Sequence, residues 1–328
     1  MNKRTLIWIL SYGALILFMF FIPLFFSGPY IIHILIFTVM NIVLASSLRL
    51  INLTGQMSLA HGGMMTIGAY TSTLLVVKLG LSSWAALLLA GCAAAVIACI
   101  IGIPFIRLKG IYFSIVTLFL TAMLTLIAQQ WRSLTGGSSG IYNIPRPDPI
   151  VIPGILNITF ISSVNCYYLV LFIMLISLVV LYAIEHSRVG RTFRGIEQSD
   201  SLAKSIGVNT SGYKVLAFSI GCFFPGVLGG FYSQYIRAIT PETFGFLFTI
   251  YILIYMVVGG QGRFIGPIIG AVVLTLLPEF LRPLKDLQPF FFAAVLMLVI
   301  FLMPEGLVGL PGRLKLAASR LFKGRGRA

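Results

Sequence analysis

The chain has 328 residues, of which 59% are hydrophobic and only 9% are charged, and its mean hydropathy is +1.02. A soluble domain carries about 25% charged residues, so this composition excludes a soluble protein, and the long uninterrupted apolar runs argue against a β-barrel. The composition therefore predicts an all-α polytopic membrane protein that contacts the lipid bilayer. Basic cytoplasmic loops explain its net charge of +15, and we expect no nucleic-acid partner.

Ten apolar runs follow one another along the chain, and each is a candidate transmembrane helix. They cover residues 6–27, 31–48, 56–77, 83–106, 111–130, 166–185, 214–236, 244–259, 264–281 and 289–308. With the N-terminus inside, most of the 23 lysine and arginine residues fall in cytoplasmic segments, which predicts that both termini are cytoplasmic. We therefore interpret residues 1–328 as a single transmembrane domain.

A loop rich in glycine, serine and proline, at residues 131–165, separates the spans into two groups of five. The first half covers residues 1–130 and the second covers 166–310, followed by a basic cytoplasmic tail at 311–328 that would be attracted to the membrane surface. Because each half has an odd number of spans, the second would be inverted relative to the first. This is the layout of inverted-repeat transporters, and it makes the loop extracytoplasmic.

Two segments inside the predicted spans combine glycine with polar residues. They are Leu53–Tyr70, LTGQMSLAHGGMMTIGAY, and Val258–Ala271, VGGQGRFIGPIIGA. A broken helix exposes backbone groups that must face protein or a water-filled path, so one interpretation is a substrate path between corresponding broken helices. The other interpretation, equally open, is close helix packing through small residues. The candidate path residues are Gln56, Ser58, His61, Gly62, Gly63, Gly259, Gly260, Gln261, Gly266 and Pro267.

Small residues elsewhere in the spans are interpreted as packing positions only. Two lines have a spacing of four residues, which lets helix backbones approach closely: Gly226 and Gly230, and Ala90, Ala94, Ala98 and Gly102. The four cysteines have no zinc-ligand or CxxC spacing, so we expect them to be packing residues as well.

The polar stretch from Glu185 to Lys214 differs from the rest of the chain. Val189, Phe193 and Ile196 recur at helical spacing, and Ala203 and Ile206 continue the stripe less regularly. Ser199 is placed to cap a second helix at its N-terminus, and Gly207 to cap it at its C-terminus. Residues 186–213 are therefore predicted to form two short amphipathic helices in the cytoplasm. They are either a docking surface for another protein or a basic loop that only sets topology.

The sequence contains none of the motifs that would let the chain supply its own energy. No acidic residue lies in the middle of a span, where ion-coupled carriers usually need one, and no GxxxxGK[ST] loop is present. We also find no catalytic or metal-ligand constellation, so we expect neither enzymatic activity nor a bound cofactor or metal. A transporter of this kind must receive energy from a partner.

Three blocks carry a family resemblance that spans about residues 40–310. GQMSLAHGGMMTIGAY, SRVGRTFRGIEQSDSLAKSIGV and VVGGQGRFIGPIIGA resemble, in this order, the branched-chain amino acid ABC permeases of the LivH/LivM family, and the second block resembles the LivM type. Gly195 and Pro225 stand where alanine is usual in the family. The resemblance makes residues 186–213 the ATPase-coupling segment. Its predicted coupling residues are Arg188, Arg191, Phe193, Arg194, Glu197, Ala203 and Gly207.

The resemblance also implies the rest of an assembly in a bacterial cytoplasmic (inner) membrane. It predicts a second, homologous permease of the LivH type, two ATPase subunits that bind ATP and Mg, and an extracytoplasmic substrate-binding protein. Leucine, isoleucine and valine are the expected cargo. Similar permeases import urea, short amides or other amino acids, so these stay open as alternatives, together with a stand-alone channel or secondary carrier.

Overall fold

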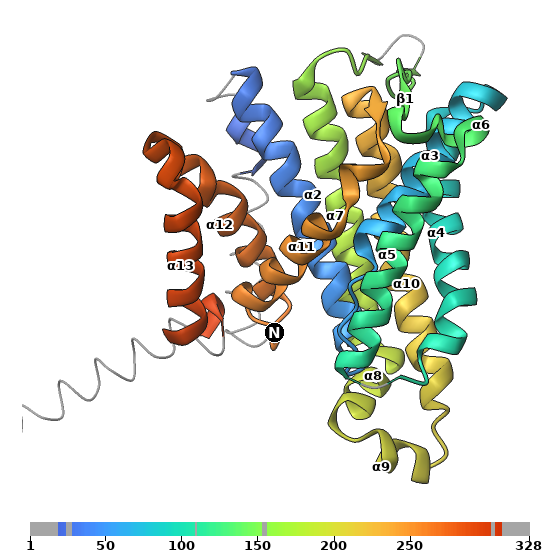
Figure 1. The fold of residues 1–328 in the computed structure, drawn as a ribbon, viewed down its shortest axis with the longest axis vertical. Coiled ribbons are helices and arrows are strands. Elements are labelled where there is room, and N and C mark those ends of the chain that lie inside the picture. Colours follow the sequence, from blue (N-terminus) through green and yellow to red (C-terminus); the bar gives the residue numbers. More distant parts are fainter. Residues whose placement is uncertain (1–18, 24–27, 109, 153–155, 303–305, 310–328) are drawn as a thin grey trace, which may run out of the picture.

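The computed structural model describes residues 19–23, 28–108, 110–152, 156–302 and 306–309. Most of the predicted span 6–27 and the whole predicted tail at 311–328 lie outside them. The long helices are α2 (Pro29–Asn52), α3 (His61–Leu79), α4 (Ser83–Phe105), α5 (Ile111–Gln130), α7 (Ser163–His186), α10 (Thr210–Ile236), α11 (Phe246–Gly259), α12 (Ile265–Leu281) and α13 (Gln288–Leu302). Short elements connect them (Figure 1): α6 (Arg132–Thr135), α8 (Arg188–Gln198), α9 (Asp200–Ser205) and the 3₁₀ turns η1 (Gly137–Ser139), η2 (Pro241–Phe244), η3 (Arg282–Leu287) and η4 (Leu307–Gly309).

Within the described residues, seven helical stretches are long and apolar enough to cross a membrane. This confirms a polytopic helical membrane protein, while the predicted count of ten spans is not confirmed. One predicted boundary is wrong: the span expected at 56–77 begins at His61, because residues 56–60 are not helical. Helix α10 begins at Thr210, inside the predicted coupling segment 186–213.

Helix α10 is the central element of the bundle, and it packs along α3 and α4 through small residues. A Cβ atom on Gly68 of α3 would overlap the backbone of Gly226, and one on Gly226 would lie 2.6 Å from the Cβ of Ala94 on α4. Ala90, Ala94 and Ala98 are fully buried, and Gly102 faces the ring of Phe218. The packing role predicted for both lines of small residues is therefore confirmed.

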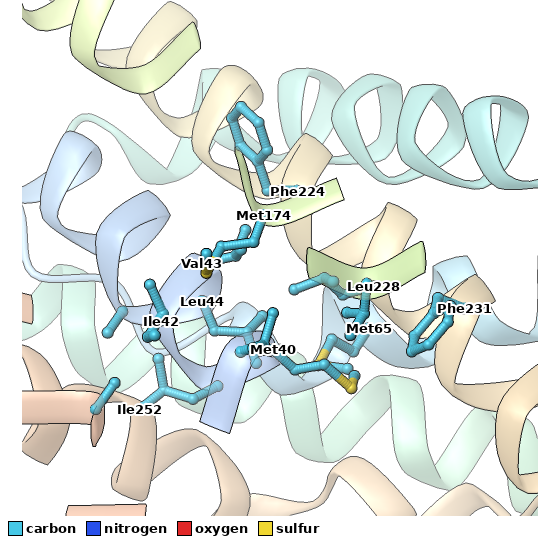
Figure 2. Packing of buried hydrophobic residues seen from close by; sticks show 14 of the residues in the cluster. Met40, Ile42, Val43, Leu44, Met65, Met174, Phe224, Leu228, Phe231 and Ile252 are labelled. Carbon is cyan, nitrogen blue, oxygen red and sulfur yellow. The ribbon is translucent and has the colours of Figure 1, made fainter. Parts of the chain in front are cut away.

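Helix α2 has the corresponding central position on the other side. It packs against α7, α12 and α11, and it also touches α10. Figure 2 shows the apolar cluster that joins these helices, where Met40 and Leu44 of α2 lie among Met174 of α7, Leu228 of α10 and Ile252 of α11. The two hairpins, α3–α4 and α11–α12, thus each pack on a central helix that belongs to the other half of the chain.

The connection between α5 and α7 contains short strands, so the fold is not purely helical. Strand β1 (Ile141–Tyr142) pairs antiparallel with β4 (Ala238–Ile239), which follows α10, and β2 (Ile150–Ile152) pairs with β3 (Leu156–Ile158). In Figure 1 this region lies at the opposite end of the bundle from α8 and α9. The predicted irregular loop is therefore partly ordered, and its first strand is attached to the second half of the chain.

Candidate functional site

The first glycine-rich segment is an irregular stretch of backbone that is buried in protein. A turn at Leu53–Gly55 ends α2, and Gly55 adopts a left-handed φ of 74°. Helix α5 then supplies hydroxyl groups to the following backbone. The Leu59 N–H donates to Thr117 Oγ1 at 2.9 Å, Thr121 Oγ1 donates to the Leu59 carbonyl at 2.9 Å, and Ser114 Oγ donates to the Met57 carbonyl at 2.6 Å. These bonds replace the missing helical ones, as a buried irregular segment requires.

The N-terminus of α3 lies against the second half of the chain. The Gly62 N–H donates to Thr249 Oγ1 of α11 at 3.2 Å, and the Gly63 N–H reaches Thr121 Oγ1 of α5 at 3.4 Å. A Cβ atom on Gly62 would overlap the Phe244 carbonyl and the Thr249 hydroxyl, and one on Gly63 would lie 2.8 Å from Leu124 Cδ1. In this conformation both glycines are close-packing positions.

Three predicted path residues beside this N-terminus are almost completely buried: Gln56, Ser58 and His61. The Ser47 hydroxyl donates to the Leu44 carbonyl at 2.9 Å and also lies 3.1 Å from His61 Nε2. His61 Nδ1 and Gln56 Oε1 have no hydrogen-bond partner among the described residues. Buried polar atoms without partners are uncommon, so this cluster is the most polar unsatisfied part of the predicted path.

The second glycine-rich segment is a tight turn between α11 and α12. Gly260 has a φ of 112°, which side-chain-bearing residues rarely adopt. A Cβ atom on Gly266 would overlap the Gly260 carbonyl, and one on Gly259 would lie 2.9 Å from the Gly270 backbone nitrogen. Pro267 is buried in the first turn of α12. These residues bring the two helix backbones together, and the turn borders a cavity of about 450 Å³ lined by Val257, residues 260–263 and residues 308–309.

The end of α2 joins the two segments. Asn52 Nδ2 donates to Gln261 Oε1 at 2.9 Å, and Arg49 Nε donates to the Gln261 carbonyl at 2.9 Å. Gln261 is thus the predicted path residue of the second segment that accepts hydrogen bonds from side chains of α2. Sequence reasoning missed Arg49 and Asn52. Arg49 was visible as a charge directly after an apolar run, but such a charge was interpreted only as a topology signal.

The polar stretch between α7 and α10 forms the two predicted short helices. Ser187 Oγ accepts from the Gly190 N–H at 3.3 Å and begins α8, and Ser199 Oγ accepts from the Leu202 N–H at 3.2 Å and begins α9. Gly207 follows α9 with a φ of 85°, as expected for a C-terminal cap. The prediction of both helices and of the caps at Ser199 and Gly207 is confirmed.

The predicted coupling residues divide into exposed and buried groups. Arg188, Arg191, Glu197 and Gly207 are exposed, whereas Phe193 and Ala203 are buried against the bundle. Ile206, which was predicted to continue the apolar stripe, does not share the burial of Phe193 and Ala203. Leu202 on α9 and Ile206 directly after it are 65% and 74% exposed, and sequence reasoning missed them as apolar residues on the surface.

Acidic groups fix these helices to the bundle. Asp200 pairs with Lys204 at 2.8 Å and with Lys214 of α10 at 3.0 Å. Burial opposes ionisation of Asp200, but hydrogen bonds from Lys204, Lys214 and Thr210 together hold its pKa well below the usual range. Burial raises the pKa of Glu197, against the opposing effect of Arg49 and Arg194. Arg194 itself donates to Glu185 of α7 at 2.7 Å.

Comparison with known proteins identifies the family. A sequence profile described as "Branched-chain amino acid transport system / permease component" matches residues 30–304. The high-affinity branched-chain amino acid transport system permease protein LivM of Salmonella typhimurium is 27% identical, over 83% of this chain and 68% of its own length. LivH of the same organism is 27% identical and BraD of Pseudomonas aeruginosa 24%, each over 78% of this chain and 87% of its own length. No solved structure matches the chain significantly. The chain belongs to the family of branched-chain amino acid transport system permease components.

Proposed function

We propose that this chain is a permease subunit of an ABC importer for branched-chain amino acids in a bacterial cytoplasmic membrane, with both termini in the cytoplasm. The observation that carries the proposal is the α8–α9 segment, because it is an ordered, capped surface built onto a bundle that has no nucleotide-binding motif of its own. ATP and Mg would be bound by two partner ATPase subunits, and this chain would be non-catalytic. The family match and the names of its relatives support this assignment.

The exposed part of α8 and α9 has the chemistry of a docking surface. Leu202 and Ile206 offer an apolar contact one helical turn apart, and Arg188 and Arg191 lie exposed on the preceding helix. A partner ATPase would cover the apolar pair with an apolar groove and meet the arginines with carboxylates or backbone carbonyls. The buried residues Phe193 and Ala203 would hold the helices in place and contribute through packing.

The substrate path is assigned to the region where the two halves meet. The packing partners support an inverted repeat. Helix α10 of the second half packs on α3 and α4 of the first half, and α2 of the first half packs on α11 and α12 of the second half, so the two halves make equivalent contacts with each other. The first turns of α3 and α11 also meet, at Gly62 and Thr249. Polar but uncharged residues such as Gln56 and Ser58 suit a small zwitterion.

The cargo assignment rests on the relatives, since specificity would reside mainly in a separate extracytoplasmic binding protein. Urea, short amides or other amino acids are the alternative cargoes within the same assembly. A stand-alone channel or secondary carrier is the alternative from another class, and the absence of partners would favour it.

Purification in a mild detergent tests the proposal. We expect a second permease of the LivH type and two ATPase subunits to be recovered with the chain, and leucine, isoleucine or valine to bind the companion binding protein in calorimetry. Single cysteines at Ser138 and Ser201, in a background without the native four, should label from opposite sides of the membrane. Recovery of the chain alone, with uptake retained, would contradict the proposal.

A further inference from the structure

A buried ion cluster lies between the α8–α9 segment and the turn that joins α11 and α12. Arg49, in the last turn of α2, has a side chain only 4% exposed, and that of Glu185, near the end of α7, is 5% exposed. Arg49 donates to both carboxylate oxygens of Glu185, through Nη1 to Oε2 and through Nη2 to Oε1 at 3.0 Å. Its remaining Nε donates to the Gln261 carbonyl, and its guanidinium lies 5.9 Å from the centre of the Phe264 ring. Together these contacts fix the orientation of the planar Arg49 guanidinium group.

The third member of the cluster belongs to α8. Arg194 Nη2 donates at 2.7 Å to Glu185 Oε1, the oxygen that also accepts from Arg49 Nη2. The Arg194 side chain, however, is 43% exposed. The carboxylate is therefore shared by one buried and one accessible arginine. If Arg194 moves away, the Arg49–Glu185 pair stays neutral as a unit and keeps its hydrogen bonds. If the Arg49–Glu185 contact breaks, a charge is left buried without a partner. Arg194 is thus the member that can detach.

Helix α8 also touches the other glycine-rich segment. A Cβ atom on Gly55 would lie 3.6 Å from the Cα of Glu197, so the last turn of α8 lies directly against the turn that precedes residues 56–60. One short helix therefore contacts the first segment directly, at Gly55, and is linked to the second segment indirectly, through Glu185 and Arg49.

We propose that Arg194, Glu185 and Arg49 act as a positioning relay that carries displacements of α8 to the α11–α12 turn, so that both path segments move with the docked partner. The inference rests on the proposed function and adds the residues through which work would pass. Glu185 receives the displacement from Arg194, and Arg49 transfers it to the Gln261 backbone. Because Arg194 can be bound to Glu185 or released from it, the cluster has two discrete states, in which the α11–α12 turn is either coupled to α8 or free of it.

The test uses the whole transporter reconstituted in lipid vesicles with its binding protein. Arg194→Gln should lower the substrate taken up per ATP hydrolysed by about fivefold or more, the lower range of known coupling between sites, while the ATPase subunits still co-purify. Arg282→Gln is the matched control, because it removes one arginine of an exposed ion pair, with Glu279 at 3.2 Å, outside the relay. This control should leave the ratio within about twofold, since exposed ion pairs contribute little.

A conformational measurement separates a relay from a merely structural role. Spin labels at Ser138 and Gly262 would report the distance from the β1 end to the α11–α12 turn, and labels at Ser138 and Ser201 the distance to α9. Both distances should change on ATP binding in the parent, whereas in Arg194→Gln only the Ser201 distance should change. A Gly262 distance that still changes in Arg194→Gln would overturn the inference.

The buried pair is tested without leaving a buried charge unpaired, because Arg194, which loses Glu185 as its partner, is accessible to solvent. The double variant Arg49→Gln with Glu185→Gln removes both charges, and it should assemble but show the same uncoupling as Arg194→Gln. Wild-type coupling in this double variant would assign the cluster to folding alone and overturn the relay. Failure of the proposed function has a different signature, because the unmodified chain would then show no ATP-dependent uptake at all.

Discussion

The two glycine-rich segments look alike in sequence but are built in opposite ways. Residues 56–60 form an irregular stretch whose backbone is held by threonine and serine hydroxyls of a neighbouring helix. Residues 260–264 form a tight turn between two helices whose backbones are in contact through Gly259, Gly266 and Gly270. The first segment depends on what another helix supplies, and the second on the absence of its own side chains. This difference shows that glycine next to glutamine in a sequence predicts an interruption of the helix. It does not predict which contacts stabilise that interruption.

The largest effect on stability is expected from a substitution that disrupts the second segment. In Gly266→Ala the new Cβ would overlap the Gly260 carbonyl, and because backbone faces backbone the contact cannot relax. We expect a loss of about 3 kcal/mol or more in stability, at the upper end for overpacking. Gly262→Ala, on the same turn, meets nothing within 4 Å and should change stability by less than about 0.5 kcal/mol. Thermal unfolding of both purified variants measures the difference, and equal melting temperatures would show that the close packing is not needed.

A smaller effect is expected when the support of the first segment is removed. Thr121→Val keeps the shape of the side chain but leaves the Leu59 carbonyl without its donor, which should cost about 1–3 kcal/mol. Thr125→Val, one turn further along α5, removes only a bond to the carbonyl of its own helix and serves as the control. Hydrogen exchange at residues 56–60 should increase in the first variant alone. Unchanged exchange there would mean that hydroxyl groups do not hold this segment.

The smallest effect concerns the contact between the two segments. Asn52→Ala removes the bond to Gln261 Oε1, and because both side chains are partly accessible, water can replace it, so we expect a loss of about 0.5–1.5 kcal/mol. Combining Asn52→Ala with Thr121→Val sharpens the comparison. If the segments act as one unit, the double variant should depart from additivity by about 0.5 kcal/mol or more. Strict additivity in chemical unfolding would show that the two breaks are independent.

Local patterns predicted the helices well. The spans at 83–106 and 111–130 agree with α4 and α5 within a residue, and Ser199 and Gly207 cap α9 as their chemistry requires. Each of these features depends on residues close together in the chain, through hydropathy or a side chain bonding its own backbone. Sequence reasoning can therefore find them without knowing the fold.

The parts that escaped prediction depend on partners far apart in the chain. The start of α3 was placed five residues early, because the hydroxyls that hold residues 56–60 come from α5, about sixty residues later. Arg49 and Glu185 are 136 positions apart, so neither could be recognised as half of a buried pair. Leu202 and Ile206 are exposed whereas Ala203 is buried, and which side of α9 faces the bundle depends on contacts with distant residues such as the pairing of Asp200 with Lys214 of α10.

Helix α10 connects the two ends of the bundle. It has 27 residues and therefore extends for about 40 Å, from just beyond the α8–α9 segment to strand β4. Its close contacts with α4 and α3 continue along much of this length, from Phe218 against Gly102, through Gly226 against Ala94, to Gly230 against Ser72. A single helix packed along its length therefore joins the docking side to the far rim, where β4 pairs with β1.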